Sequence, residues 1–249
     1  LFQGKFFILF SFLFGWGLAI QMASSQRAGV SGTARFLKRL IGLAVIGVAH
    51  AVFVFFGDIL VLYAILGIPL LLRWEASPRA LISVAGGAVA VGFCALMLLA
   101  ASFAEPSSLG LGAADGPGYV GSFADSVRQR MVEWPVGFAF IVLFNGPIAF
   151  AAFCLGLAAA KVDFFQVGNT VYLALRRKLA LLLLTGLTLN LVYALGVSGF
   201  MGQGLWAALS FASLAIGGPV LACAYLVIAV EVARRGAFQD ATTAAGRVS

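Results

Sequence analysis

The sequence predicts an all-α integral membrane protein, a polytopic bundle of about seven transmembrane helices with one short interfacial helix on the outer membrane surface. Hydrophobic residues make up 62% of the 249 residues and charged residues 10%, against roughly 45–50% and 25% in soluble domains. Apolar runs recur along the whole length, and about 20 apolar residues cross a hydrocarbon core of roughly 30 Å as a helix. No stretch of soluble composition is left over, so residues 1–249 are expected to form a single transmembrane domain in a lipid bilayer.

The apolar runs differ in length and in the residues that interrupt them. The third run is short, because only about 14 residues, roughly 21 Å of helix, separate Asp58 from Arg73, and Pro69 lies among them. Gly86-Gly87 and Gly217-Gly218-Pro219 interrupt two other runs. Small residues favour close packing of helices; the alternative is that these breaks line a cavity. The seven expected spans cover residues 6–23, 40–56, 59–73, 80–102, 136–160, 177–198 and 206–232.

The distribution of Lys and Arg predicts the orientation of the bundle. Thirteen of the 16 basic residues follow the first, third, fifth or seventh expected span. The exceptions are Lys5, Arg128 and Arg130. The positive-inside rule places the basic set in the cytoplasm, so Leu1 is expected outside and Ser249 inside. The chain has no initiator methionine and begins close to an apolar run, so we expect a fragment whose neighbouring helices are missing. Since the basic residues flank spans, we do not expect nucleic-acid binding.

The long connection 103–135 divides into two parts. Its first half is rich in turn-forming residues and is expected to be irregular. In its second half Ser122 and Asp125 have the spacing of a capping box, and apolar residues recur at helical intervals with Arg128 and Arg130 opposite them. This pattern predicts a short amphipathic helix on the outer surface. Its apolar stripe is Phe123, Val127, Met131 and Trp134.

His50 is the only histidine, and it lies inside an apolar run about 16 Å along the helix from Arg39. An ionisable group at membrane depth suggests a functional site. Histidine can act as a base or proton relay near neutral pH; the alternative is a neutral imidazole bonded to a neighbouring helix. Asp58 lies about 12 Å further along, too far to touch His50 on a continuous helix, and is expected to cap the third span. Tyr63 is expected to face the same cavity, or to be an interfacial aromatic residue.

Several classes of protein find no support in the sequence. Cys94, Cys154 and Cys223 lie inside apolar runs without the paired spacing of a metal site or a disulfide. There is no Ser/His/Asp arrangement, no glycine-rich nucleotide loop and no His/Cys ligand set. A hydrolase, a nucleotide-driven motor and a metalloenzyme are therefore not expected.

Two motifs in the first third of the chain resemble the YeiB-like family of bacterial inner-membrane proteins, a family of domains of unknown function (family 418). One is a phenylalanine-glycine pattern near the start, and the other is an Arg-Leu pair followed by His and then by Gly-Asp-Ile-Leu. The family usually has an upstream helix with an Asp and an Arg-Gly pair and a downstream Leu-Thr-Asn-Tyr helix, and both are missing here. The residues that carry the resemblance are Gly4-Lys5-Phe6-Phe7, Phe10 to Gly15, Arg39-Leu40, His50, Gly57-Asp58-Ile59-Leu60, Tyr63-Ala64 and Gly67.

The resemblance implies a function, because the family is distantly similar to membrane acyltransferases. Those enzymes pass an acyl group from cytoplasmic acyl-CoA to an extracytoplasmic acceptor such as a sugar or glycan. By this analogy His50 takes a proton from the acceptor, with Asp58 and Tyr63 beside it, and basic residues meet the phosphates of acyl-CoA. Those residues otherwise serve only as positive-inside anchors. The alternatives for the protein are a transporter or permease for a small or lipid-like solute, and a non-catalytic assembly protein. The basic residues in question are Arg35, Lys38, Arg39, Arg176, Arg177 and Lys178.

Overall fold

The computed structural model describes residues 4–102, 121–202 and 204–235, and this part of the chain folds into α-helices without any strand. The expected irregular half of the long connection, and both chain ends, lie outside the described residues. The helices are α1 (Lys5–Arg27), α2 (Gly32–Phe53), α3 (Leu60–Leu72), α4 (Pro78–Ser102), α5 (Phe123–Lys161), α6 (Thr170–Arg177), α7 (Leu179–Val197), α8 (Leu205–Ala212) and α9 (Leu214–Arg234).

The prediction of an all-helical fold is confirmed for the described residues, and the lengths and composition of the helices agree with a membrane protein. Six helical stretches in the described residues are long and apolar enough to cross a bilayer, with α8 and α9 together counted as one stretch, Leu205–Arg234. The expected third span corresponds to α3, which has 13 residues and falls short of that length. The bundle therefore has six full-length candidate spans and one short apolar helix.

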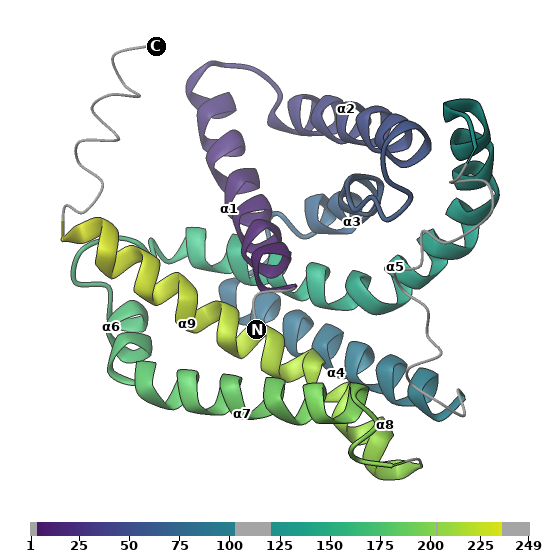
Figure 1. Ribbon diagram of the computed structural model, residues 1–249. Helices are drawn as coiled ribbons and strands as arrows, with labels where there is room; N and C mark the ends of the chain where they lie inside the picture. Colours follow the sequence, from purple (N-terminus) through teal and green to yellow (C-terminus); the bar gives the residue numbers. More distant parts are fainter. Residues whose placement is uncertain (1–3, 103–120, 203, 236–249) are drawn as a thin grey trace.

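Helix α5 is the central element of the bundle (Figure 1). Helices α1 and α4 pack along it, α2 pairs with α3, and α7 pairs with α9. Helices α1 and α5 approach each other closely, because Gly15 of α1 and Gly156 of α5 each face the backbone of the other helix, where a Cβ would collide. Aromatic rings then fill the core between α1, α3 and α5, with the centroids of Phe14 and Tyr63 lying 4.5 and 5.0 Å from that of Phe153.

The expected surface helix is instead the first part of α5. The capping box is confirmed, since Ser122 Oγ accepts from the Asp125 amide and the Asp125 carboxylate accepts from the Ser122 amide. The helix does not stop at Pro135, however. It runs on to Lys161, so that α5 has 39 residues in all, about 58 Å of helix, and Figure 1 shows it turning sharply around one side of the bundle. A proline removes one backbone hydrogen bond, which bends a helix without ending it when packing holds both halves.

The other interruptions in the apolar runs also proved to be continuous helix. Pro69, Pro147 and Pro219 all lie inside helices. Close packing is confirmed at Gly217, whose added Cβ would lie 2.7 Å from Leu189 Cβ of α7. The same expectation was wrong for Gly86-Gly87, which has no described atom within 4 Å of an added Cβ.

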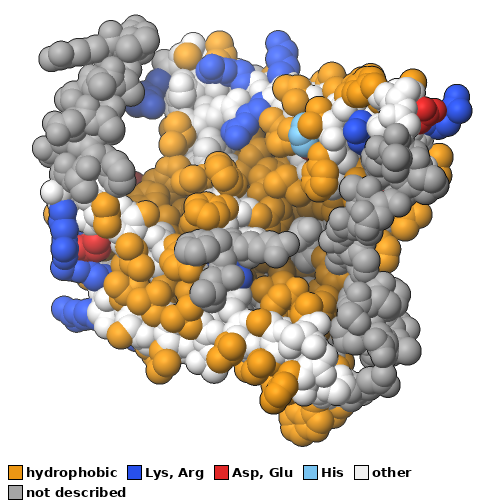
Figure 2. Space-filling model, in the orientation of Figure 1, with side chains coloured by type: hydrophobic (Ala, Val, Ile, Leu, Met, Phe, Trp, Pro, Cys, Tyr) orange, Lys and Arg blue, Asp and Glu red, His pale blue; other side chains and the backbone are white. Residues whose placement is uncertain are grey.

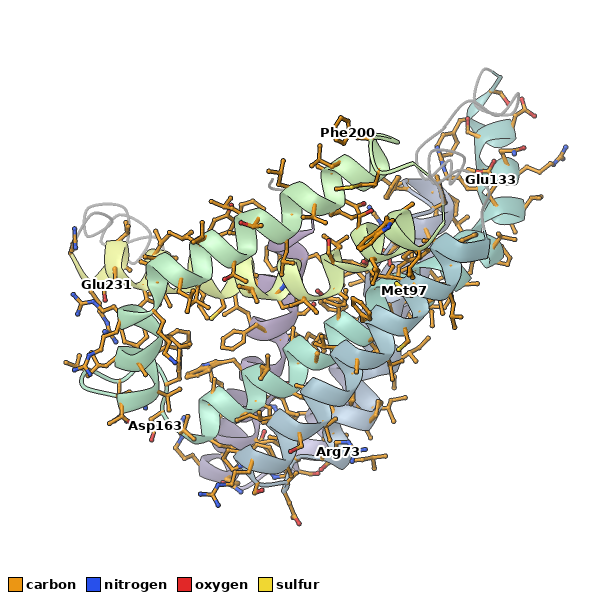
Figure 3. The ribbon with its side chains drawn as sticks, turned by 90° about the horizontal axis from the view of Figure 1, so that it is seen from below. Arg73, Met97, Glu133, Asp163, Phe200 and Glu231 are labelled. Atoms are coloured by element: carbon orange, nitrogen blue, oxygen red, sulfur yellow. The ribbon has the colours of Figure 1, made fainter. Side chains whose placement is uncertain are left out.

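The helices define two ends of the bundle. We call the end that carries the turns 28–31, 73–77 and 162–169 the basic end, and the end that carries the turns 54–59 and 198–202 the hairpin end. Figure 3 shows Asp163 and Glu231 on the side of the basic end, and Glu133 and Phe200 on the opposite side. Hydrophobic side chains occupy most of the surface between them (Figure 2), as the surface of a protein embedded in lipid requires.

Candidate functional site

The candidate site is built by the turn between α2 and α3. The apolar run continues to Phe56, but α2 ends at Phe53, where the amides of Val54 and Phe55 both donate to the carbonyl of His50 at 2.9 Å. The chain then reverses over residues 54–59, and α3 begins at Leu60. His50 therefore lies in the last turn of α2, close to the hairpin end.

This reversal brings Asp58 back against His50. The distance from His50 Nδ1 to Asp58 Oδ2 is 2.8 Å. The prediction that the two residues lie too far apart was wrong, because it assumed one continuous helix. The prediction that Asp58 caps the next helix is confirmed, since its second oxygen, Oδ1, accepts from the amides of Leu60 at 2.8 Å and Val61 at 3.3 Å. One buried carboxylate thus binds both the imidazole and the start of α3.

Gly47 makes room for this carboxylate. It lies one helical turn before His50, and a Cβ added there would come within 2.8 Å of Asp58 Oδ1 and of the Val61 amide nitrogen. The start of α3 can approach α2 this closely only because residue 47 has no side chain. No pattern in the sequence indicates this role of Gly47, because it depends on the position of the turn.

The hydrogen bond to Asp58 sets the chemistry of the imidazole. An ionised carboxylate only accepts, so we assign the proton of a neutral His50 to Nδ1. Nε2 then carries the lone pair and can take a proton from another group. The side chain of His50 is 40% exposed while that of Asp58 is 3% exposed, and Figure 2 shows the only histidine at the surface among hydrophobic side chains. The pair is therefore a buried carboxylate hydrogen-bonded to a partly exposed imidazole.

Tyr63 is not brought to this pair. Its hydroxyl lies 2.6 Å from Ser11 Oγ and 3.1 Å from the carbonyl oxygen of Phe7, both on α1. The expectation that Tyr63 faces one cavity with His50 and Asp58 was therefore wrong, because a hydroxyl buried in the core is satisfied by α1 instead. Its side chain stabilises the packing of α3 against α1.

Arg130 is a residue of this region that the sequence did not identify. It was expected to point away from the membrane-facing side, but its Nη1 donates to the carbonyls of Val52 at 3.3 Å and Phe53 at 2.9 Å. These are among the last carbonyls of α2, where a cation is favoured by the helix dipole. Figure 1 shows α5 bending so that its first turns lie beside the end of α2, and a sequence pattern does not reveal such a bend.

The six basic residues proposed for acyl-CoA fall into two groups. Arg35 and Lys38 are exposed on the first half of α2, whereas the guanidinium of Arg39 lies 4.6 Å above the ring of Phe14 and packs against α1. The second group, Arg176, Arg177 and Lys178, is exposed at the end of α6, which packs on α7 and α9.

The fold and this site define a class, a polytopic α-helical membrane protein with a His–Asp pair in a helical hairpin. No protein-family model and no solved structure matches the chain. The chain is 40% identical over 80 residues to the uncharacterized protein YxaH of Bacillus subtilis (strain 168). This match covers 32% of the chain and 20% of the relative's own length. Within the described residues, no group of three His, Cys, Asp or Glu side chains lies close enough together to hold a metal ion.

Proposed function

We propose that this protein is a membrane acyltransferase in which His50 is the general base and Asp58 orients it. The single observation that supports the proposal is the 2.8 Å contact between His50 Nδ1 and Asp58 Oδ2. A carboxylate that fixes the tautomer of a histidine and stabilises its protonated form is a recurrent arrangement for acyl transfer. The resemblance to YeiB-like proteins supports the same reaction class, although fold-level analogy alone does not establish chemistry.

The proposed step uses the free nitrogen of His50. Nε2 accepts the proton of an acceptor hydroxyl or amine while the acceptor oxygen or nitrogen bonds to the carbonyl carbon of a thioester. The carbon–sulfur bond then breaks, and the departing CoA thiolate takes the proton back from His50. The imidazole is neutral before and after the step, and Asp58 stabilises its charge in between.

The acyl donor is proposed to be acyl-CoA, with the basic end in the cytoplasm of a bacterial inner membrane and the hairpin end outside. The positive-inside rule supports this orientation. Arg35 and Lys38 are exposed at the basic end and suit phosphate groups. His50 lies about 16 Å from Arg39 along α2, so a donor held at that helix need bridge only part of the membrane. The acceptor is proposed to be an extracytoplasmic sugar or glycan.

A transporter is the main alternative, and breaks in the membrane helices would support it, because transporters bind solutes at such breaks. The helices run through Pro69, Pro147 and Pro219. Even at Ser213, between α8 and α9, the backbone hydrogen bonds to Leu209 and from Gly217 are retained. Unwound backbone of the kind that binds solutes in transporters is therefore absent from the described helices. The position of the His50 side chain against Asp58 supports acyl transfer instead.

The test is binding and turnover of a radiolabelled long-chain acyl-CoA by the purified chain in detergent. We expect saturable binding and slow release of CoA, with water replacing the natural acceptor. His50→Ala should retain binding and release CoA at least 100-fold more slowly, since a general base contributes roughly 10²–10⁴ in rate. Ser198→Ala, an exposed hydroxyl at the same end, is the control and should behave as the wild type. Absence of saturable binding would leave a transporter or an assembly protein.

A further inference from the structure

We infer that the basic end carries a binding site for the headgroup of an anionic phospholipid. It is formed by the end of α6 and the end of α9, and we call it the α6 patch. This inference is independent of the acyl transfer proposed above. The patch consists of Arg176, Arg177, Lys178, Arg234 and Arg235.

The first observation is the amphipathic character of α6. This eight-residue helix begins at an Asn169 cap, whose side-chain oxygen accepts from the Tyr172 amide. Tyr172 points inward and is fully buried, while Val171 is 49% exposed and Val167, just before the helix, is 92% exposed. Exposed valines beside a run of cations are typical of a helix that lies in the membrane interface. Figure 1 shows α6 at the ends of α7 and α9, where such an interface would run.

The second observation is that two of the five cations, Arg176 and Arg234, are held in place by neighbouring side chains and backbone. Glu231 accepts a hydrogen bond from the Tyr172 hydroxyl at 2.6 Å and pairs with Arg176 at 3.3 Å. Arg234 lies 4.3 Å above the Tyr172 ring and donates to the carbonyl of Phe165 at 3.0 Å. Burial, and then the bond to Glu231, raise the pKa of the Tyr172 phenol, so this central donor stays neutral. Arg176 and Arg234 are therefore positioned by the protein itself, beside the exposed Arg177 and Lys178.

The third observation is the charge balance. The patch has five cations, and Glu231 is the carboxylate that pairs with one of them, Arg176, so the patch keeps a clear positive excess. Figure 2 shows Lys and Arg side chains gathered around an acidic one at the left edge of the molecule, and Figure 3 shows Glu231 among nitrogen-bearing side chains. A phosphodiester complements this excess, and arginine binds phosphate in a bidentate manner. The neighbouring Val167 and Val171 suit the apolar part of a lipid and have no function toward a soluble phosphate.

The experiment is native mass spectrometry of the detergent-solubilised chain with phosphatidylglycerol, and with phosphatidylcholine of the same acyl chains. We expect saturable binding of phosphatidylglycerol and much weaker binding of phosphatidylcholine. A cation near an anionic lipid surface contributes about 1 kcal/mol, so Arg177→Gln with Lys178→Gln should weaken binding roughly 30-fold. Arg177→Gln alone should weaken it about fivefold, which provides a second and milder variant.

The matched control removes two exposed cations from the same end but outside the patch, Arg27→Gln with Arg79→Gln. This variant should bind phosphatidylglycerol within about twofold of the wild type, because screening by salt limits the reach of distant charges. Equal weakening in the two double variants would overturn the inference, since it would reflect net charge alone. Equal affinity for the two lipids, or displacement of phosphatidylglycerol by CoA at stoichiometric concentration, would overturn it as well.

Discussion

At the scale of single residues, Gly47 determines how closely α3 approaches α2. An added Cβ would lie 2.8 Å from Asp58 Oδ1 and from the Val61 amide nitrogen. We expect Gly47→Ala to lower the free energy of unfolding in detergent by about 1–3 kcal/mol, the usual cost of overpacking. Thermal unfolding followed by circular dichroism measures this change.

Gly42 of the same helix provides the control, because an added Cβ there would meet no described atom within 4 Å. Gly42→Ala should leave stability unchanged or raise it by up to about 1 kcal/mol, since alanine favours a helix more than glycine does. If both alanine variants lost stability equally, the role assigned to Gly47 would be wrong.

Asp58 combines two roles that substitution can separate. Asparagine caps a helix about as well as aspartate, whereas alanine does not, at a cost of about 0.5–2 kcal/mol. We expect Asp58→Asn to keep the start of α3 and to lose the charge that orients His50, and Asp58→Ala to lose both. The stability order should therefore be wild type, Asn and then Ala.

The same variants can be examined through the imidazole itself. Because the chain has one histidine, a ¹⁵N-histidine NMR spectrum contains the signals of His50 alone. We expect the Nδ1 and Nε2 shifts to change in Asp58→Asn and to stay unchanged in Ser198→Ala. Unchanged shifts in Asp58→Asn would show that the carboxylate does not determine the tautomer.

At the scale of elements, Arg130 attaches the first turns of α5 to the end of α2. A cation at a helix C-terminus contributes about 0.3–2 kcal/mol. Arg130→Met should therefore raise hydrogen–deuterium exchange of residues 123–134 roughly two- to thirty-fold. Arg128→Met is the control, because Arg128 is exposed in the same segment. Identical exchange in the two variants would contradict this attachment.

The helices that the sequence predicted well are those with long apolar runs, because burial of apolar surface in lipid depends little on neighbours. The points at which helices end were harder to predict. The run Val52 to Phe56 is apolar throughout, yet α2 ends at Phe53, within residues that are β-branched or aromatic and form helices less well. The His50–Asp58 contact follows from that end, so the sequence identified both residues and missed their contact. At Pro135 the error was the opposite one: a helix end was expected, but α5 continues through this residue.

At the scale of the whole molecule, the distribution of Lys and Arg leads to a prediction of topology. In a variant with all three cysteines replaced, single cysteines at Ser31 and Ser198 report the two ends. We expect an impermeant thiol reagent to label Ser198→Cys in intact cells and Ser31→Cys only after permeabilisation, because the positive-inside rule predicts that the basic end faces the cytoplasm. The reverse pattern of labelling would show that the bundle has the opposite orientation, and it would exclude the basic end as a site for cytoplasmic acyl-CoA.

The short third helix has a consequence for the membrane around the protein. Helix α3 has 13 residues and spans about 20 Å, against about 33 Å for the 22 residues of its neighbour α2. A hydrophobic stretch shorter than the bilayer core is accommodated by local thinning and by lipids that match its length. The hairpin that carries His50 would then lie at the bottom of a depression in the lipid surface. Water and polar head groups reach further inward there, so the imidazole of His50 would be hydrated although α2 borders on lipid. The thickness of the bilayer would then determine how deeply a polar acceptor must enter the membrane to reach His50.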